Sequence, residues 1–308
     1  MLDILPTIGA VLLIVALGYL IKHKQLFHES LWGALARLCY WVLFPGLLFN
    51  LTSRAVLAGD LLGPFLIALS CGALVVVLFA YLAGRMLGAS GPAMSSLIQG
   101  GLRHNGFLAL SILQGAAGLT ALEIGAIGVA FLVPISNIVA VVVLFLFSTE
   151  PTPQNLGRAV ARELVRNPLI GAVILGVAVN IFDIPVPSFL SIAADMLGAA
   201  ALPLLLLSIG ASLQFASIRG NSVLLMVAVI AKILVFPSVL VGLGYLFGLS
   251  TVACVVLAAI GAAPTATSSY ALAKELGGDA DLMAEIILVQ TLVAAVTMPV
   301  WLLVAASL

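Results

Sequence analysis

The sequence predicts an all-α membrane protein of ten transmembrane helices, built as two inverted five-helix repeats with broken, crossing helices in the fourth and ninth spans. Composition supports the class, because hydrophobic residues make up 63% of the chain and charged residues only 8%. Run length supports it too, because the apolar residues form continuous stretches of about 20, enough to cross a bilayer as a helix. Continuous rather than alternating runs exclude a transmembrane β-barrel.

Ten apolar windows follow one another with short loops between them, so no soluble domain is expected between the spans. In chain order the predicted spans are 4–22, 31–53, 61–85, 92–116, 123–148, 167–183, 187–215, 221–247, 250–273 and 282–306. Asp281 and Glu285, at the start of the last span, are expected to be solvated.

The basic residues predict the orientation of these spans. If the N-terminus lies outside, all the loop residues Lys22, Lys24, Arg85, Arg158, Arg162, Arg166, Arg219 and Lys274 fall inside, and only Arg54 falls outside. Inner loops of membrane proteins carry an excess of Lys and Arg. Both termini are therefore expected outside.

The two halves of the chain resemble each other. Ile-Gly-Ala-Val occurs in the first span from Ile8 and in the sixth from Ile170, and Pro45 in span two corresponds to Pro203 in span seven. An odd number of spans per repeat inserts the second copy upside down, as in many secondary carriers. The expected domains are a first repeat at 1–148, a cytoplasmic linker at 149–166 and a second repeat at 167–308.

Two short polar interruptions, Gly100–Gly106 and Gly261–Ser269, occupy corresponding places in the two halves. Helix breaks at membrane depth are costly, because freed backbone groups find no water there, and they survive where they line a cavity. A matched pair of interrupted helices in two halves points to the binding site of a secondary transporter.

The interruptions have the chemistry of an anion site. The half-helices that begin near Gly106 and Thr265 present N-termini, each with unpaired N–H groups and a partial positive charge. Arg103 adds a fixed charge whose forked geometry suits a carboxylate, or it makes a structural ion pair. His104 carries a coupling proton or is a hydrogen-bonded residue of the break. Asn105 caps the freed backbone and also contacts ligand.

Other polar residues inside the spans complete the candidate site. Hydroxyls in membrane helices often bond back to their own backbone, and amides often pack between helices, so each has a structural alternative. The residues predicted to contact substrate are Arg103, His104, Asn105, Gly106, Pro264, Thr265, Thr267, Ser268, Asn50, Asn137 and Gln290. The candidates for ion coupling are His104, Lys232 and Asp195, with ion pairing for Lys232 and snorkelling for Asp195 as the alternatives.

These residues carry a resemblance to a known family. The stretch from Ala263 to Asp279, with Met298-Pro299-Val300-Trp301 after it, resembles the ninth and tenth helices of the auxin efflux carrier family, and Arg103 to Leu110 resembles its polar fourth helix. The resemblance spans the chain and implies a prokaryotic carrier of organic anions such as malonate or auxin, often dimeric. Family members usually carry a proline where this chain has Ser111, which leaves open how sharply the fourth span is broken.

The sequence therefore predicts a secondary transporter of a small carboxylate, working by alternating access of the elevator type, in the bacterial inner membrane as a homodimer. A passive anion channel and a membrane sensor are the alternatives. Coupling to H⁺, or uncoupled movement, is favoured over coupling to Na⁺, because neither interruption contains an acidic residue. No cofactor, metal or nucleic acid is expected, and enzyme motifs such as HExxH and G-x-S-x-G are absent from the sequence.

Overall fold

The computed structural model describes residues 4–55, 59–147, 157, 161, 165–213 and 222–308, and the secondary structure of these residues is helical. Most of the predicted linker, with Arg158 and Arg162, and also Arg219, lies outside the described residues. The helices are α1 Ile4–His23, α2 Ser30–Leu38, α3 Phe44–Arg54, α4 Gly59–Met86, α5 Gly91–Leu102, α6 Gly106–Ala116, α7 Gly118–Phe147, α9 Pro168–Ile181, α10 Ser188–Ser212, α11 Ser222–Ile230, α12 Phe236–Leu246, α13 Thr251–Ala262, α14 Ser268–Glu275 and α15 Ala280–Ser307.

The helices confirm a multi-pass membrane protein. Six continuous helical segments are long and apolar enough to span a bilayer: Ser30–Arg54, Leu61–Met86, Gly118–Phe147, Ser188–Ser212, Ser222–Leu246 and Ala280–Ser307. Of the other four predicted spans, one is a single helix of 20 residues, one is a helix of 14 residues, and two are divided. The first and sixth correspond to the apolar helices α1 and α9, and the fourth and ninth are divided into α5–α6 and α13–α14. The count of ten spans stays a prediction.

The chain divides into two compact units, and each takes segments from both halves of the sequence. Unit 1 comprises described residues within 1–58, 107–130 and 164–213, and unit 2 those within 59–106, 131–163 and 214–308. Helix α7 contributes residues to both units. Unit 2 therefore holds both polar interruptions, whereas α6 from Phe107 on belongs to unit 1.

Unit 1 is built by close packing of α1 on α10 and of α3 on α9 and α10. Glycines allow the backbones of α1 and α10 to touch. A Cβ at Gly210 would lie 1.8 Å from the carbonyl oxygen of Val15, and one at Gly18 would lie 2.1 Å from that of Leu207. Small residues at such contacts are how helices associate where no hydrophobic effect drives them together.

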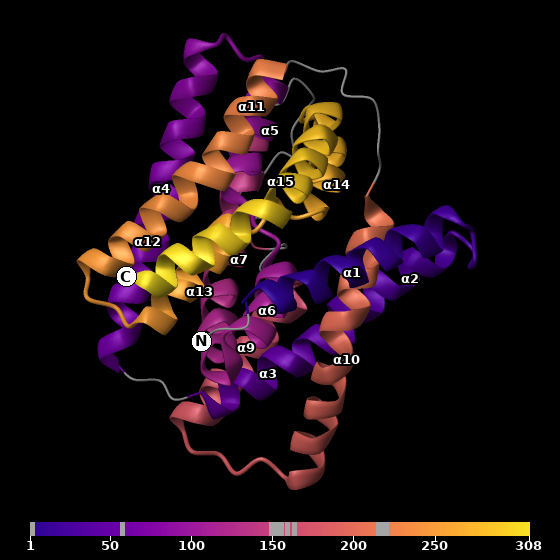
Figure 1. Cartoon of the computed structure of the whole chain (residues 1–308), viewed down its shortest axis with the longest axis vertical. Coiled ribbons are helices and arrows are strands. Elements are labelled where there is room, and N and C mark those ends of the chain that lie inside the picture. The colour runs from indigo at the N-terminus through magenta and orange to yellow at the C-terminus, as the bar shows by residue number, and fades with distance from the viewer. Residues whose placement is uncertain (1–3, 56–58, 148–156, 158–160, 162–164, 214–221) are drawn as a thin grey trace. The chain divides into compact units, whose positions relative to one another are not determined.

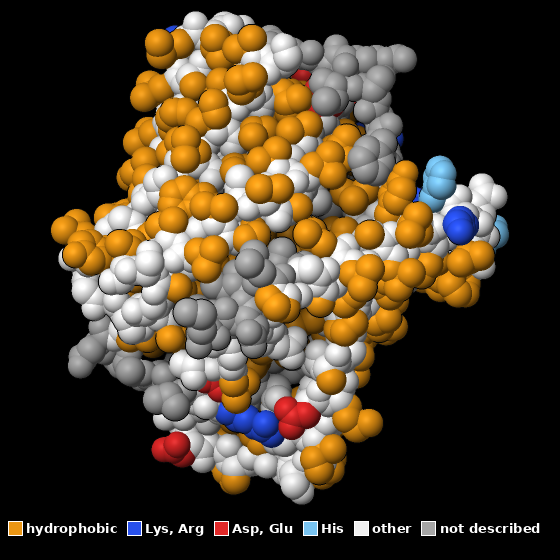
Figure 2. Space-filling view, in the orientation of Figure 1, with side chains coloured by type: hydrophobic (Ala, Val, Ile, Leu, Met, Phe, Trp, Pro, Cys, Tyr) orange, Lys and Arg blue, Asp and Glu red, His pale blue; other side chains and the backbone are white. Residues whose placement is uncertain are grey.

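Unit 2 packs α4 against α5 and α12, and α13 against α12 and α15, as Figure 1 shows for α4 and α12. One of its apolar clusters brings Leu97 and Ile98 of α5 together with Leu225 of α11 and Ile286 of α15. Exposed leucines such as Leu74 and Leu78 continue along the outside of α4, and Figure 2 shows hydrophobic side chains over this helix and over α11 and α12. That surface suits contact with lipid.

Two spans contain a π-helical turn, at Cys39–Leu43 in unit 1 and at Ala231–Val235 in unit 2. Each turn is followed directly by Phe-Pro: Phe44-Pro45 in one case and Phe236-Pro237 in the other. Proline has no backbone N–H, so it cannot close the usual bond to the carbonyl four residues earlier, and the helix absorbs an extra residue there. Both phenylalanines are fully buried.

Candidate functional site

The first interruption breaks the helix between α5 and α6. Gly88, with φ +66°, turns the chain into α5, and the hydroxyl of Ser90 caps that helix by accepting from Ala93 N at 3.4 Å. Arg103 leaves the helix with φ −64° and ψ 139°, although its N–H still bonds to Gln99 O at 2.9 Å. The break forms without a proline at Ser111, whose hydroxyl instead bonds back to Phe107 O inside α6.

The second interruption follows the same backbone plan. Gly248, with φ +64°, precedes the cap Ser250, which accepts from Ala253 N at 3.3 Å. Ala263 then leaves α13 with φ −62° and ψ 134°, and its N–H bonds to Ala259 O at 3.1 Å. Helix α14 begins at Ser268, so this break is longer than the first.

The two interruptions meet inside unit 2. Asn105 N donates to Pro264 O at 2.7 Å, and the Thr265 hydroxyl donates to Gly100 O at 2.7 Å. Each break therefore supplies a partner for backbone groups that the other has freed, which is the requirement for irregular backbone at membrane depth.

Gln290 of α15 completes the bonding of the second break. Its amide oxygen accepts from Thr265 N at 2.9 Å and, at 2.7 Å from Thr265 Oγ1, shares the single hydroxyl proton with Gly100 O. Its amide nitrogen donates to Gly100 O at 3.0 Å and to Ala228 O at 2.9 Å. The side chain is fully buried, so a saturated amide ties α15 to α5, α11 and the second break.

Arg103 brings the fixed charge of the first break into the interior. The residue is 7% exposed, and Nη2 donates to Asn137 Oδ1 of α7 at 3.0 Å and to Ser268 Oγ of α14 at 3.1 Å. Both of these acceptors are neutral. A guanidinium held by two helices other than its own is positioned rather than free to move.

Two further basic groups lie within electrostatic range of each other. His104 interacts with the charges of Lys232 and Arg103. His104 is 4% exposed, and neither ring nitrogen has a hydrogen-bond partner among the described residues. Lys232, in the π-helical turn of unit 2, is 0% exposed. Its Nζ lies 4.5 Å from the centroid of the Phe236 ring and has no hydrogen-bond partner in the described part of the chain.

Asn50 and Asp195 belong to unit 1, where they contact each other. The Asn50 amide donates to Asp195 Oδ1, and Arg54 Nη1 lies 3.3 Å from both oxygens of the same carboxylate. The structure thus gives Asp195 an amide and a guanidinium as partners.

The remaining predicted residues differ in exposure. Gly106 and Pro264 are buried, whereas Thr267 and Ser268 are exposed at the start of α14. Asp281 is exposed as expected, but Glu285, one turn later on α15, is buried, so its predicted solvation is wrong. Sequence reasoning missed Gln99, which is buried beside the first break, whereas Ser269, buried at the start of α14, lies within the predicted second interruption.

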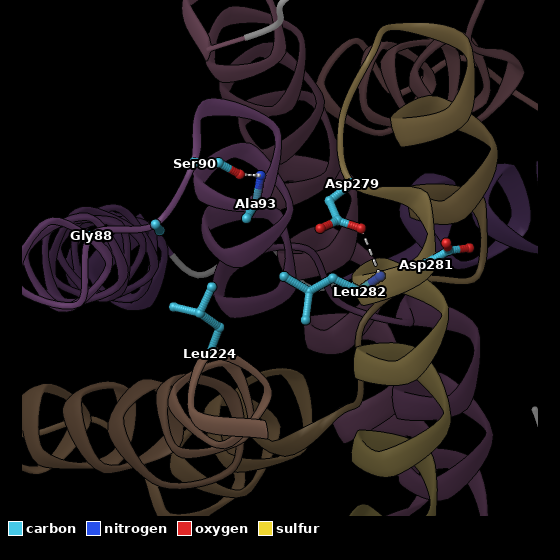
Figure 3. Close-up of a pocket in the computed structure, with 8 residues that line it drawn as sticks. Gly88, Ser90, Ala93, Leu224, Asp279, Asp281 and Leu282 are labelled. Carbon is cyan, nitrogen blue, oxygen red and sulfur yellow. Dashed lines mark hydrogen bonds between the residues drawn. The ribbon is translucent and has the colours of Figure 1, made fainter. Parts of the chain in front are cut away.

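A separate pocket of about 360 Å³ lies at the N-terminal ends of α5 and α15, beside Leu224 of α11 (Figure 3). Two of its polar groups are engaged in capping, because Asp279 accepts from Leu282 N at 2.9 Å and Ser90 accepts from Ala93 N. None of the predicted substrate residues lines it. Among the described residues, no group of three or more His, Cys, Asp or Glu side chains is placed to hold a metal ion.

A helical membrane protein with buried polar helix breaks has the architecture of a membrane transporter, and the comparisons agree. Residues 117–302 match the family model described as membrane transport protein. Over 301 residues the chain is 27% identical to an uncharacterized transporter of Methanothermobacter thermautotrophicus, with 96% of each chain covered. The protein belongs to this membrane transport family, the auxin efflux carrier family.

Proposed function

We propose that this protein is a secondary transporter of a small organic anion, a carboxylate of the auxin or malonate type. The observation that carries the proposal is the buried Arg103, positioned by Asn137 and Ser268 where the two interruptions bond to each other. A guanidinium binds a carboxylate through two parallel hydrogen bonds. The first turns of α6 and α14 directly follow the breaks and supply helix N-termini that favour an anion.

We assign substrate contact to the residues beside this guanidinium, His104, Asn105, Gly106, Pro264, Thr265 and Thr267, together with Asn137, Ser268 and Gln290 of the same unit. Within this set Gln290 and Thr265 act chiefly by holding the second break, since they bond to each other. Asn50, the remaining candidate for substrate contact, lies in unit 1, where its amide donates to Asp195.

The transport cycle that fits this chain is alternating access of the elevator type. Unit 2 holds the site-bearing break and the spans at α4, α11–α12 and α15, and unit 1 holds α1, α2–α3, α9 and α10. We propose that the second group is the scaffold, through which a homodimer forms, and that the halves are inverted repeats with both termini outside. The near-identical backbone of α5 and α13 supports the repeat.

Movement of H⁺, or uncoupled movement, is proposed over Na⁺ symport. His104 and Lys232 are buried, titratable and without hydrogen-bond partners among the described residues, and they interact electrostatically. Asp195 is the third coupling candidate, through its ion pair with Arg54. A Na⁺ gradient imposed on proteoliposomes at constant pH and membrane potential is expected not to drive accumulation, and accumulation by that gradient alone would contradict the assignment.

The function is tested by carboxylate uptake into proteoliposomes. A carrier gives saturable uptake that is accelerated by substrate preloaded on the opposite side, because its site is exposed to one side at a time. Linear uptake without this acceleration would identify a channel instead. Binding without any flux would leave the sensor as the correct function.

A further inference from the structure

The π-helical turn at Ala231–Val235 receives a hydrogen bond from the side chain of another helix. Pro237 has no N–H, so it cannot donate to Ile233 O, four residues earlier, as an ordinary helix residue would. Trp301 of α15 supplies a donor instead, because its indole Nε1 donates to Ile233 O at 2.8 Å. Ile233 is buried, and a backbone carbonyl at membrane depth needs such a partner, since hydrocarbon offers none.

Helix α15 bonds to this span on both sides of Lys232. Gln290 Nε2 donates at 2.9 Å to Ala228 O, four residues before the lysine, and the Trp301 bond falls one residue after it. Gln290 and Trp301 are 11 residues apart, which is about three turns of an α-helix, so they share one face of α15. One face of one helix therefore holds the backbone that carries the lysine.

The π-helical turn determines where the Lys232 side chain lies. The turn packs against the last turn of α5, because a Cβ on Gly101 would lie 3.4 Å from Ala231 Cβ. Lys232 Nζ lies 4.5 Å from the centroid of the Phe236 ring, and His104, in the break that follows α5, interacts with it electrostatically. The extra residue of a π turn rotates the helix before it by about 100° relative to the helix after it. Conversion of this turn to α-helix would therefore redirect the lysine.

We propose that Trp301 is a positioning residue for H⁺ coupling, whose indole N–H holds the π-helical turn in the form that keeps Lys232 beside the first break. This role depends on the proposed function, in which Lys232 takes part in H⁺ coupling. Trp301 acts through the backbone of the turn and binds no substrate. Without its N–H the turn loses a restraint, the lysine leaves its place beside Phe236, and substrate crosses the membrane without the proton.

Trp301→Phe tests this role, because it removes the indole N–H and keeps an aromatic ring. The purified full chain is reconstituted in proteoliposomes, with labelled malonate and labelled indoleacetate as probes. Accumulation driven by a pH gradient should fall about tenfold, as expected for the loss of one hydrogen bond, whereas exchange of the probe across the membrane should be kept. The number of protons moved per substrate, measured with a pH-sensitive dye inside the vesicles, should fall as well.

Trp41→Phe is the matched control, because Trp41 is an exposed tryptophan in the π-helical turn of unit 1. It should change neither accumulation nor exchange. Unchanged accumulation in Trp301→Phe, or an equal loss of accumulation and exchange, would overturn the positioning role and leave coupling through Lys232 standing. An equal loss is what a residue that only supports the fold would give.

Failure of the underlying function gives different results. If a pH gradient drives no accumulation by the unsubstituted protein, or drives it equally in Lys232→Met, coupling through Lys232 is wrong and the positioning role falls with it. If neither probe exchanges across the membrane, anion transport itself is wrong.

Discussion

The two helix breaks of unit 2 share a backbone and differ in what their side chains need. Both follow a helix of 12 residues that is capped by serine, and both leave it at an extended residue whose N–H still bonds four residues back. The second break is neutral, and Gln290 satisfies its backbone at Thr265 while bonding to two further backbone carbonyls. The first break carries Arg103 and His104. The second break therefore holds the backbone through Gln290, and the first break carries the positive charge of Arg103.

The largest effect on folding is expected at Gln290, which bonds to the second break. Gln290→Leu leaves Thr265 N–H without its acceptor in a buried site and should lower the free energy of unfolding by about 2–4 kcal/mol. Denaturant titration of the purified protein measures this. Gln99→Leu is the matched control, since the same change there removes no hydrogen bond found among the described residues. Equal losses for both substitutions would contradict the distinction between the breaks.

Removal of the Arg103 charge should reduce transport strongly and change the stability of the protein little. Arg103→Ala is expected to reduce carboxylate uptake on the order of 100-fold while the protein still reaches the membrane, because the site loses charge-assisted bonds to the anion. Arg103→Lys should restore uptake in part, since an ammonium lacks the forked geometry. Arg85→Ala, at the exposed end of α4, serves as the control. Full uptake by Arg103→Ala would mean that the helix N-termini bind the anion alone.

The buried lysine allows coupling to be separated from binding. Lys232→Met should abolish accumulation driven by a pH gradient and keep exchange of substrate across the membrane. Its melting temperature should not fall, because a buried ammonium without a hydrogen-bond partner is costly. Proteoliposome assays of accumulation and of exchange give the two readouts, with exposed Lys274→Met as the control. Retained gradient-driven accumulation would exclude Lys232 from coupling.

The smallest effect tests the shared backbone. Ser90→Ala and Ser250→Ala should each destabilise the protein by about 1 kcal/mol, the usual contribution of an N-cap hydroxyl. The equality of the two losses, measured by thermal unfolding, is the informative result. A loss at one cap only would show that the two helices are not equivalent.

Much of the helical fold could be predicted from the apolar runs and from the polar residues that interrupt them. The lengths of the apolar runs predicted α4, α7, α10 and α15, and the polar residues from Arg103 to Gly106 and Pro264 predicted the breaks, although α5 continues through Gly100 and Gly101 to Leu102. The π-helical turns were not predicted, because an extra residue in a helix changes its bonding without leaving a pattern in hydropathy. The prolines at 45 and 237 were the available signal, through the N–H that each one lacks.

The candidate site was predicted less completely, because residue type does not tell which polar groups are already paired. Gln290 and Gln99 are the same residue in the same unit, and only the contacts separate the saturated amide from the unsatisfied one. Gln99 did carry a signal, its place one turn before Arg103 on the same helical face. The burial of Glu285 had none, since it lies one turn after an exposed aspartate.

The contact of α1 with α10 has a consequence for biogenesis. The glycines at 18 and 210 fit against backbone carbonyls of helices from opposite halves of the chain, so α1 enters the membrane long before its packing partner exists. Synthesis at about 5–20 residues per second separates the two on the order of ten seconds. During that interval the backbone of α1 at Gly18 faces lipid, because its packing partner on α10 has not yet been made. The first helix must therefore remain stable in the bilayer by its own hydropathy until α10, which ends at residue 212 of 308, has been synthesised.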